Sequence, residues 1–92
     1  MTVEERAYWL WYSTVKGVSY ADKMEIIRIV RSPSCFFHYS SSAILKMLPK
    51  HSKAVAVLCK SVNNGIEAYL DAVRGMNENL KDWVTPIYNN GD

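Results

Sequence analysis

Signals that begin an α-helix recur along this chain at intervals too short for long helices or for a continuous sheet. Each signal is a hydroxyl side chain that can accept the backbone amide hydrogen of a residue shortly after it in the chain. Two prolines suit the first helical position, one directly after the cap at Ser32 and the other at the start of a later helix. The recurrence predicts several short helices joined by turns. The caps are Thr2, Ser19, Ser32 and Ser40, and the prolines are Pro33 and Pro49.

Between these signals, apolar residues recur every three or four positions, as they do on the buried face of an amphipathic helix. Gly17 and the Asn-Asn-Gly sequence at residues 63–65 interrupt the pattern, because glycine and asparagine favour helix ends. Residues 83–88 have a strand-like composition around Pro86. We therefore predict an all-α bundle of five or six short helices, followed by an extended tail. The predicted helices span about residues 3–15, 20–31, 33–39, 43–48, 49–62 and 66–80.

The chain is long enough for one modest hydrophobic core. At 92 residues, about 64% of the surface of the unfolded chain would be buried on folding. The contents of 49% hydrophobic and 22% charged residues are those of an ordinary globular protein and exclude a disordered or collagen-like chain. No apolar run could span a bilayer, and the acidic opening residues do not form a secretory signal. With two cysteines and no close pair, we expect a cytoplasmic protein without membrane contact.

Charge is unevenly distributed, although the net charge is only +2. Residues 16–60 contain eight lysines and arginines against Asp22 and Glu25, and residues 61–92 contain two against five acidic residues. A basic middle of this kind suits a polyanion, a membrane surface or an acidic partner. The alternative is a solvated helix face that only keeps the protein in solution.

Residues with catalytic or metal-binding chemistry do not fall into a recognisable frame. Zinc ligands usually come as two pairs, each closely spaced in the sequence. Of the candidate pairs here, Cys35 and His38 are close together, but His51 and Cys59 are widely spaced. The serines already serve as helix caps, and the four glycines are too scattered for a phosphate-binding loop. We therefore predict no enzymatic activity, no metal and no cofactor. The zinc candidates that this reasoning rejects are Cys35, His38, His51 and Cys59.

The turn between the first two predicted helices has most of a helix-hairpin-helix sequence. Such motifs bind nucleic-acid backbones through a hydrophobic-x-Gly-hydrophobic-Gly turn, whose exposed amides approach a phosphate. Gly17 and Val18 fit this form, but Ser19 replaces the second glycine and is also needed as a helix cap. The substitution weakens the case for phosphate binding by this turn.

Several residues in this order resemble the N-terminal domain of the bacterial DNA-processing family DprA, also called Smf. The opening stretch at residues 5–11, the Lys16-Gly17-Val18 turn and the Ser32-Pro33 pair carry the resemblance. Near the end, residues 80–88 with Gly91-Asp92 are similar to the strand and turn that lead into the family's Tyr-Pro segment. Residues 34–79 match the family only in helical pattern.

The resemblance implies a SAM-like or helix-hairpin-helix-like domain at residues 1–80, with residues 81–92 starting a Rossmann-like domain. In the family, that second domain binds single-stranded DNA, forms homodimers and helps to load the RecA recombinase during natural transformation. The implied role of this chain is that of an accessory domain with weak, non-specific nucleic-acid contact. The alternative is a protein-interaction module that docks its own downstream domain or a partner. The aromatic residues of the first helix favour it, and of these we expect Trp9 and Tyr12 to face the partner.

If the domain binds DNA, the contacts should come from lysines of the basic middle and from the hairpin turn. Lys46, Lys50 and Lys53 could form one patch across the junction at Pro49, and Lys60 lies seven residues after Lys53 on the same helix face. Lysine contacts to phosphate carry no base specificity. The predicted nucleic-acid-binding residues are Lys16, Gly17, Lys23, Lys46, Lys50, Lys53 and Lys60.

Overall fold

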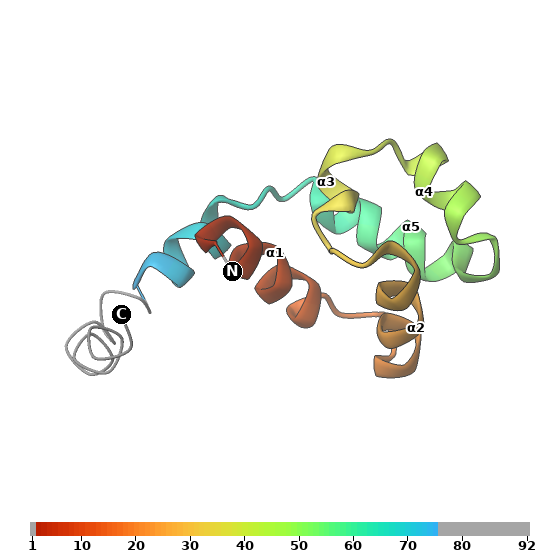
Figure 1. The fold of residues 1–92 in the computed structure, drawn as a ribbon, viewed down its shortest axis with the longest axis horizontal. Helices are drawn as coiled ribbons and strands as arrows, with labels where there is room; N and C mark the ends of the chain where they lie inside the picture. Colours follow the sequence, from red (N-terminus) through yellow and green to blue (C-terminus); the bar gives the residue numbers. More distant parts are fainter. Residues whose placement is uncertain (1, 76–92) are drawn as a thin grey trace, which may run out of the picture.

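The computed structural model describes residues 2–75, and this part of the chain is built from helices without strands (Figure 1). The prediction of an all-α bundle of short helices is confirmed, whereas the predicted tail and the end of the last helix lie outside the described residues. Residues 67–75 form a further helical stretch. The elements before it are α1 (Val3–Thr14), α2 (Tyr20–Val30), α3 (Cys35–His38), α4 (Ser41–Met47), the 3-10 helix η1 (Pro49–His51) and α5 (Ser52–Val62).

Three of the four predicted hydroxyl caps begin helices as expected. In each, the side-chain oxygen accepts an amide hydrogen from the first turn, which would otherwise have no partner within the helix. These caps are local contacts, so the sequence alone is enough to predict them. The amide nitrogens of Glu5, Asp22 and Ala43 lie 3.1, 3.1 and 3.2 Å from the hydroxyl oxygens of Thr2, Ser19 and Ser40.

Ser32 acts differently from the other caps. Its hydroxyl accepts the amide hydrogen of Ser34 at 3.3 Å, and the two hydroxyl oxygens lie 2.9 Å apart. This short-range contact closes a turn around Pro33, as serine side chains often do in place of a helical bond. As a result α3 begins at Cys35, two residues after the predicted start at Pro33.

The core lies where α3 and α4 pack against α5, and α1 inserts one indole into it. Trp11 is fully buried, and its ring centroid lies 5.8 Å from that of Phe36 and 4.8 Å from that of Phe37. The indole N–H donates a hydrogen bond to Ser61 Oγ at 3.0 Å, which satisfies the one polar atom of this side chain. The other fully buried large apolar residues of the core are Ile26, Ile44, Leu48, Val55 and Leu58.

Residues 67–75 return the chain to α1. Val73 is buried, and the hydroxyl groups of Thr14 and Tyr69 lie 3.4 Å apart. Figure 1 shows this last helical stretch beside α1, while α2, α3 and α4 surround α5 at the other end of the domain. Within residues 2–75, every helix is too short or too polar to cross a bilayer.

Candidate nucleic-acid interface

The turn between α1 and α2 packs directly against α5. Gly17 has φ of +91°, a backbone conformation that residues with a Cβ rarely adopt. A Cβ atom at this position would lie 3.4 Å from the Cγ1 atom of Val57. Glycine is therefore favoured here for its backbone conformation, while a Cβ atom would be in ordinary van der Waals contact with α5.

Lys23 holds the two arms of this hairpin together. Its ammonium group donates to the carbonyl oxygen of Val15 at 2.7 Å and to that of Ser13 at 3.2 Å. In return, the Tyr12 hydroxyl donates to the carbonyl oxygen of Lys23 at 2.6 Å. Carbonyl groups at the end of α1 need such partners, because no further turn of helix supplies them. Lys23 was predicted to contact DNA, but the structure places its charge on the protein's own backbone.

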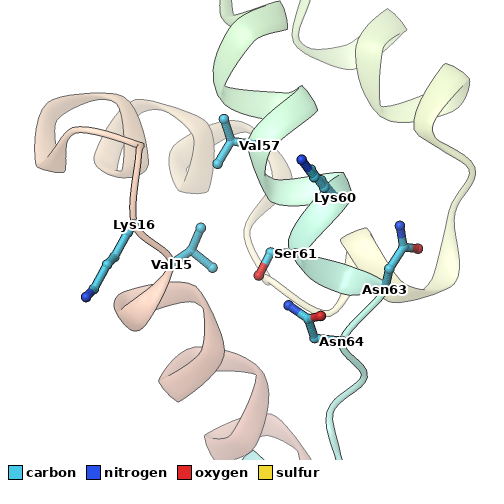
Figure 2. A pocket seen from close by; sticks show the side chains of 7 residues that line it. All are labelled: Val15, Lys16, Val57, Lys60, Ser61, Asn63 and Asn64. Carbon is cyan, nitrogen blue, oxygen red and sulfur yellow. The ribbon is translucent and has the colours of Figure 1, made fainter.

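A cavity of about 390 Å³ opens between this turn and the end of α5 (Figure 2). Lys16 stands on the turn and Lys60 on α5, so residues far apart in the sequence form its two walls. Val15 and Val57 provide apolar surface between them. None of the lining residues carries a negative charge, which makes the cavity suitable for an anion. Its remaining lining residues are Ser61, Asn63 and Asn64.

The ammonium groups of Lys16 and Lys60 form no ion pair with any other residue within 2–75. The carbonyl oxygens at the nearby helix ends already have partners. Lys23 occupies that of Val15, and the amides of residues 63–65 occupy those of residues 60–62. The two lysines are therefore the charged groups of the cavity that are available to a ligand.

The other predicted lysines do not join this cavity. Lys50 and Lys53 line a second cavity of about 300 Å³, near the start of α5, together with Asp22 and His51. Lys46 is exposed on α4 and lines neither cavity. Lys60 thus belongs with Lys16, and the continuous patch expected from residues 46–60 is divided between the two ends of α5.

The four residues considered for zinc do not come together in one site among the described residues. The two cysteines are neighbours, whereas each histidine has surroundings of its own. Cys35 is buried, and burial together with the neighbouring Cys59 thiol raises the pKa of its own thiol to about 11. His38 packs edge-on against Tyr8, with ring centroids 5.9 Å apart. His51 instead faces two carboxylates of α2. These neighbours come from distant parts of the chain, so sequence spacing could not identify them.

An apolar groove of about 390 Å³ lies between α1 and α2. Trp9, Tyr20 and Met24 line it and are exposed, with Tyr20 at 77%. The sequence indicated Trp9 and Tyr12 as possible contact residues, and Tyr12 also lines this groove although it is largely buried. Tyr20 and Met24 were missed, because their exposure depends on how α2 crosses α1.

No known family model matches this sequence, and neither the curated proteins nor the solved structures contain a detectable relative. The resemblance to the DNA-processing family therefore stays a prediction. The geometry of the site has to support any functional conclusion by itself.

Proposed function

We propose that this domain makes weak, sequence-independent contact with single-stranded nucleic acid through the cavity between Lys16 and Lys60. The observation that carries the proposal is a cavity with a lysine on each side and no carboxylate in its lining, where neither lysine has an ion-pair partner among the described residues. Lysine ammonium groups bind phosphate oxygens as point charges, and the asparagine side chains can add hydrogen bonds to phosphate or sugar. The expected role is accessory, beside a principal binding domain.

The proposed contact should be weak and strongly dependent on salt. Two lysines neutralise about two phosphates, which gives a slope near −1.4 in a plot of log affinity against log salt for a single strand. The dissociation constant should be in the non-specific range of about 10⁻⁴ to 10⁻⁶ M or weaker at physiological salt. Because lysines contact phosphates and do not read base edges, oligonucleotides of different sequence should bind alike.

The test is an NMR titration of the 92-residue chain with a short single-stranded oligonucleotide at low salt. Amide shifts should concentrate around Lys16, Lys60 and residues 61–64. A Lys16→Glu, Lys60→Glu double variant should lose them, because it places two like charges opposite the phosphates. The matched control is Lys46→Glu with Arg28→Glu, which changes the net charge by the same amount at two exposed sites outside the cavity.

Equal loss of binding in the control and the double variant would contradict the cavity and indicate a general charge effect. Absence of shifts at low salt would contradict nucleic-acid binding altogether. That outcome would favour the alternative of a protein-interaction module, for which the apolar groove beside Trp9 is the surface to examine. A role beside a DNA-binding domain that loads a RecA-type recombinase stays a prediction from the family resemblance.

A further inference from the structure

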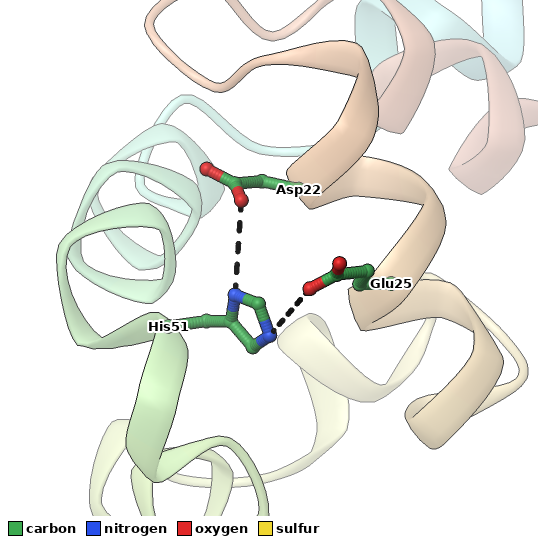
Figure 3. A group of neighbouring side chains, drawn as sticks. All are labelled: Asp22, Glu25 and His51. Atoms are coloured by element: carbon green, nitrogen blue, oxygen red, sulfur yellow. Dashed lines mark ion pairs between the residues drawn. The ribbon is translucent and has the colours of Figure 1, made fainter.

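His51 is largely buried beside α2, and each of its two ring nitrogens faces a different carboxylate of that helix (Figure 3). Nε2 lies 3.3 Å from Glu25 Oε2, and Nδ1 lies 3.9 Å from Asp22 Oδ1. Only 14% of the imidazole is exposed, against 48% and 60% of the two acidic side chains. Within residues 2–75, the imidazole makes no other polar contact.

Two separate elements create this arrangement. Asp22 and Glu25 are three residues apart on α2, a spacing that places both on one face of the helix. His51 ends η1, at the corner where the chain turns into α5. Each of the three residues offers one atom that could bind a metal ion, and these three atoms lie within 4.8 Å of one another. The set is thus more than a group of acidic residues, since it contains a largely buried imidazole from a different part of the fold.

We propose that Asp22, Glu25 and His51 form a binding site for a divalent transition-metal ion, with zinc as the best match. Zinc binds imidazole nitrogen and carboxylate oxygen at about 2.0–2.2 Å in a tetrahedral arrangement, which puts neighbouring ligand atoms roughly 3.3 Å apart. The separation between His51 Nε2 and Glu25 Oε2 has this value. Asp22 lies nearer to the other ring nitrogen, so its half-exposed side chain has to move for its oxygen to share the ion with Nε2. Water would supply the fourth ligand.

The charges around the site set limits on the affinity. Two carboxylates balance the charge of the ion, whereas Lys50 and Lys53 line the adjoining cavity and oppose a cation there. Protons compete with the metal, because only a neutral imidazole nitrogen can coordinate it. When no metal is bound, a protonated ring forms an ion pair with both carboxylates and is within hydrogen-bond distance of Glu25. Binding should therefore weaken as the pH falls from 7.5 to 5.5.

The test is a zinc titration of the metal-free 92-residue chain at pH 7.5, followed by calorimetry and by NMR of the histidine ring resonances. One equivalent of zinc should shift the His51 ring signals and raise the unfolding temperature by preferential binding to the native state. Removing one of three protein ligands through Glu25→Gln should weaken binding by at least about 10-fold, the lower limit seen for outer-shell partners. His51→Gln should abolish the site.

Two control variants separate this site from adventitious binding. His38→Gln removes the other histidine, which is exposed, and Cys59→Ser removes the more accessible of the two thiols. Both variants should bind zinc with unchanged affinity. Glu25 is 60% exposed, so its variant remains informative if His51→Gln fails to fold. The proposal is overturned if the His51 signals do not respond to millimolar zinc, or if binding survives Glu25→Gln but is lost in Cys59→Ser.

Discussion

His51 Nε2 lies 3.3 Å from Glu25 Oε2 and thereby joins the corner before α5 to the middle of α2. In metal-free protein this contact should contribute only modestly to stability, because the Glu25 carboxylate is largely exposed. A double-mutant cycle with His51→Gln and Glu25→Gln at pH 5.5 should give a coupling free energy of about 0.2–1 kcal/mol. Urea unfolding of the four proteins measures it. Strictly additive effects would mean that the two side chains do not interact.

Removing the Ser61 hydroxyl should destabilise the domain more than its small size indicates. Ser61→Ala leaves the buried indole N–H of Trp11 without an acceptor, at a cost of about 1–3 kcal/mol. Ser42→Ala is the control, because Ser42 is exposed and has no side-chain hydrogen bond with another described residue. Thermal unfolding compares the two. Equal unfolding temperatures would show that the bond between Trp11 and Ser61 is unimportant.

Substitution of Lys23 should affect the stability of the domain, whereas substitution of Lys16 should affect oligonucleotide binding. Lys23→Met removes both ammonium contacts to the carbonyl oxygens at the end of α1 and should lower the free energy of unfolding by about 1–2 kcal/mol. Lys16→Met should leave stability unchanged within about 0.5 kcal/mol and weaken oligonucleotide binding. Urea unfolding and the NMR titration are applied to both variants. The opposite pattern would reverse the roles assigned to the two lysines.

Alkaline conditions should destabilise the domain through Cys35. Burial raises the pKa of its thiol to about 11, above the value of about 8.5 for an unfolded chain. The native state then holds its proton more tightly, so the stabilising contribution is complete below about pH 8.5 and is lost as the pH rises through about 11. Burial also raises the pKa of Tyr12, which acts in the same direction at higher pH.

The measurement for this prediction is the urea midpoint at pH 7.5, 9 and 10.5. The midpoint should fall with rising pH, and Cys35→Ala should make the fall between the last two values shallower. At pH 8.5, alkylation of Cys35 in the native protein should be much slower than in urea. Rapid native alkylation would contradict the burial of this thiol.

Most of the fold could be predicted because its determinants are local. The hydroxyls of Thr2, Ser19 and Ser40 cap helices within three residues of themselves, and Gly17 and Gly65 have the positive φ angles that favour helix ends. Ser32 was the exception. Its hydroxyl accepts the amide hydrogen of Ser34 and not that of Cys35, three residues on, as the other caps would. This depends on the geometry around Pro33, which sequence spacing does not specify.

The candidate sites could be predicted only in part, because they depend on contacts between distant residues. Lys60 and Lys16 line the same cavity only because the hairpin turn packs on Val57. His51 meets the carboxylates of α2 only because η1 places it there. The sequence named the basic residues as candidates, and that they bind nucleic acid stays a prediction. Sequence spacing could not group them, and it could not show that Lys23 is bound to carbonyl oxygens.

Trp11, whose indole donates a hydrogen bond to Ser61, is completely buried, whereas Trp9 is 37% exposed. The two tryptophans of the described residues thus have opposite surroundings. With Trp83 replaced by phenylalanine and excitation at a wavelength that tyrosine does not absorb, the fluorescence of the chain would come from these two indoles alone. An iodide quencher would reach Trp9 and not Trp11, so that the quenched part of the emission reports on the groove. The unquenched part reports on whether the first helix is still attached to the core. The protein thus carries its own pair of optical probes, which distinguish ligand binding from unfolding without any added label.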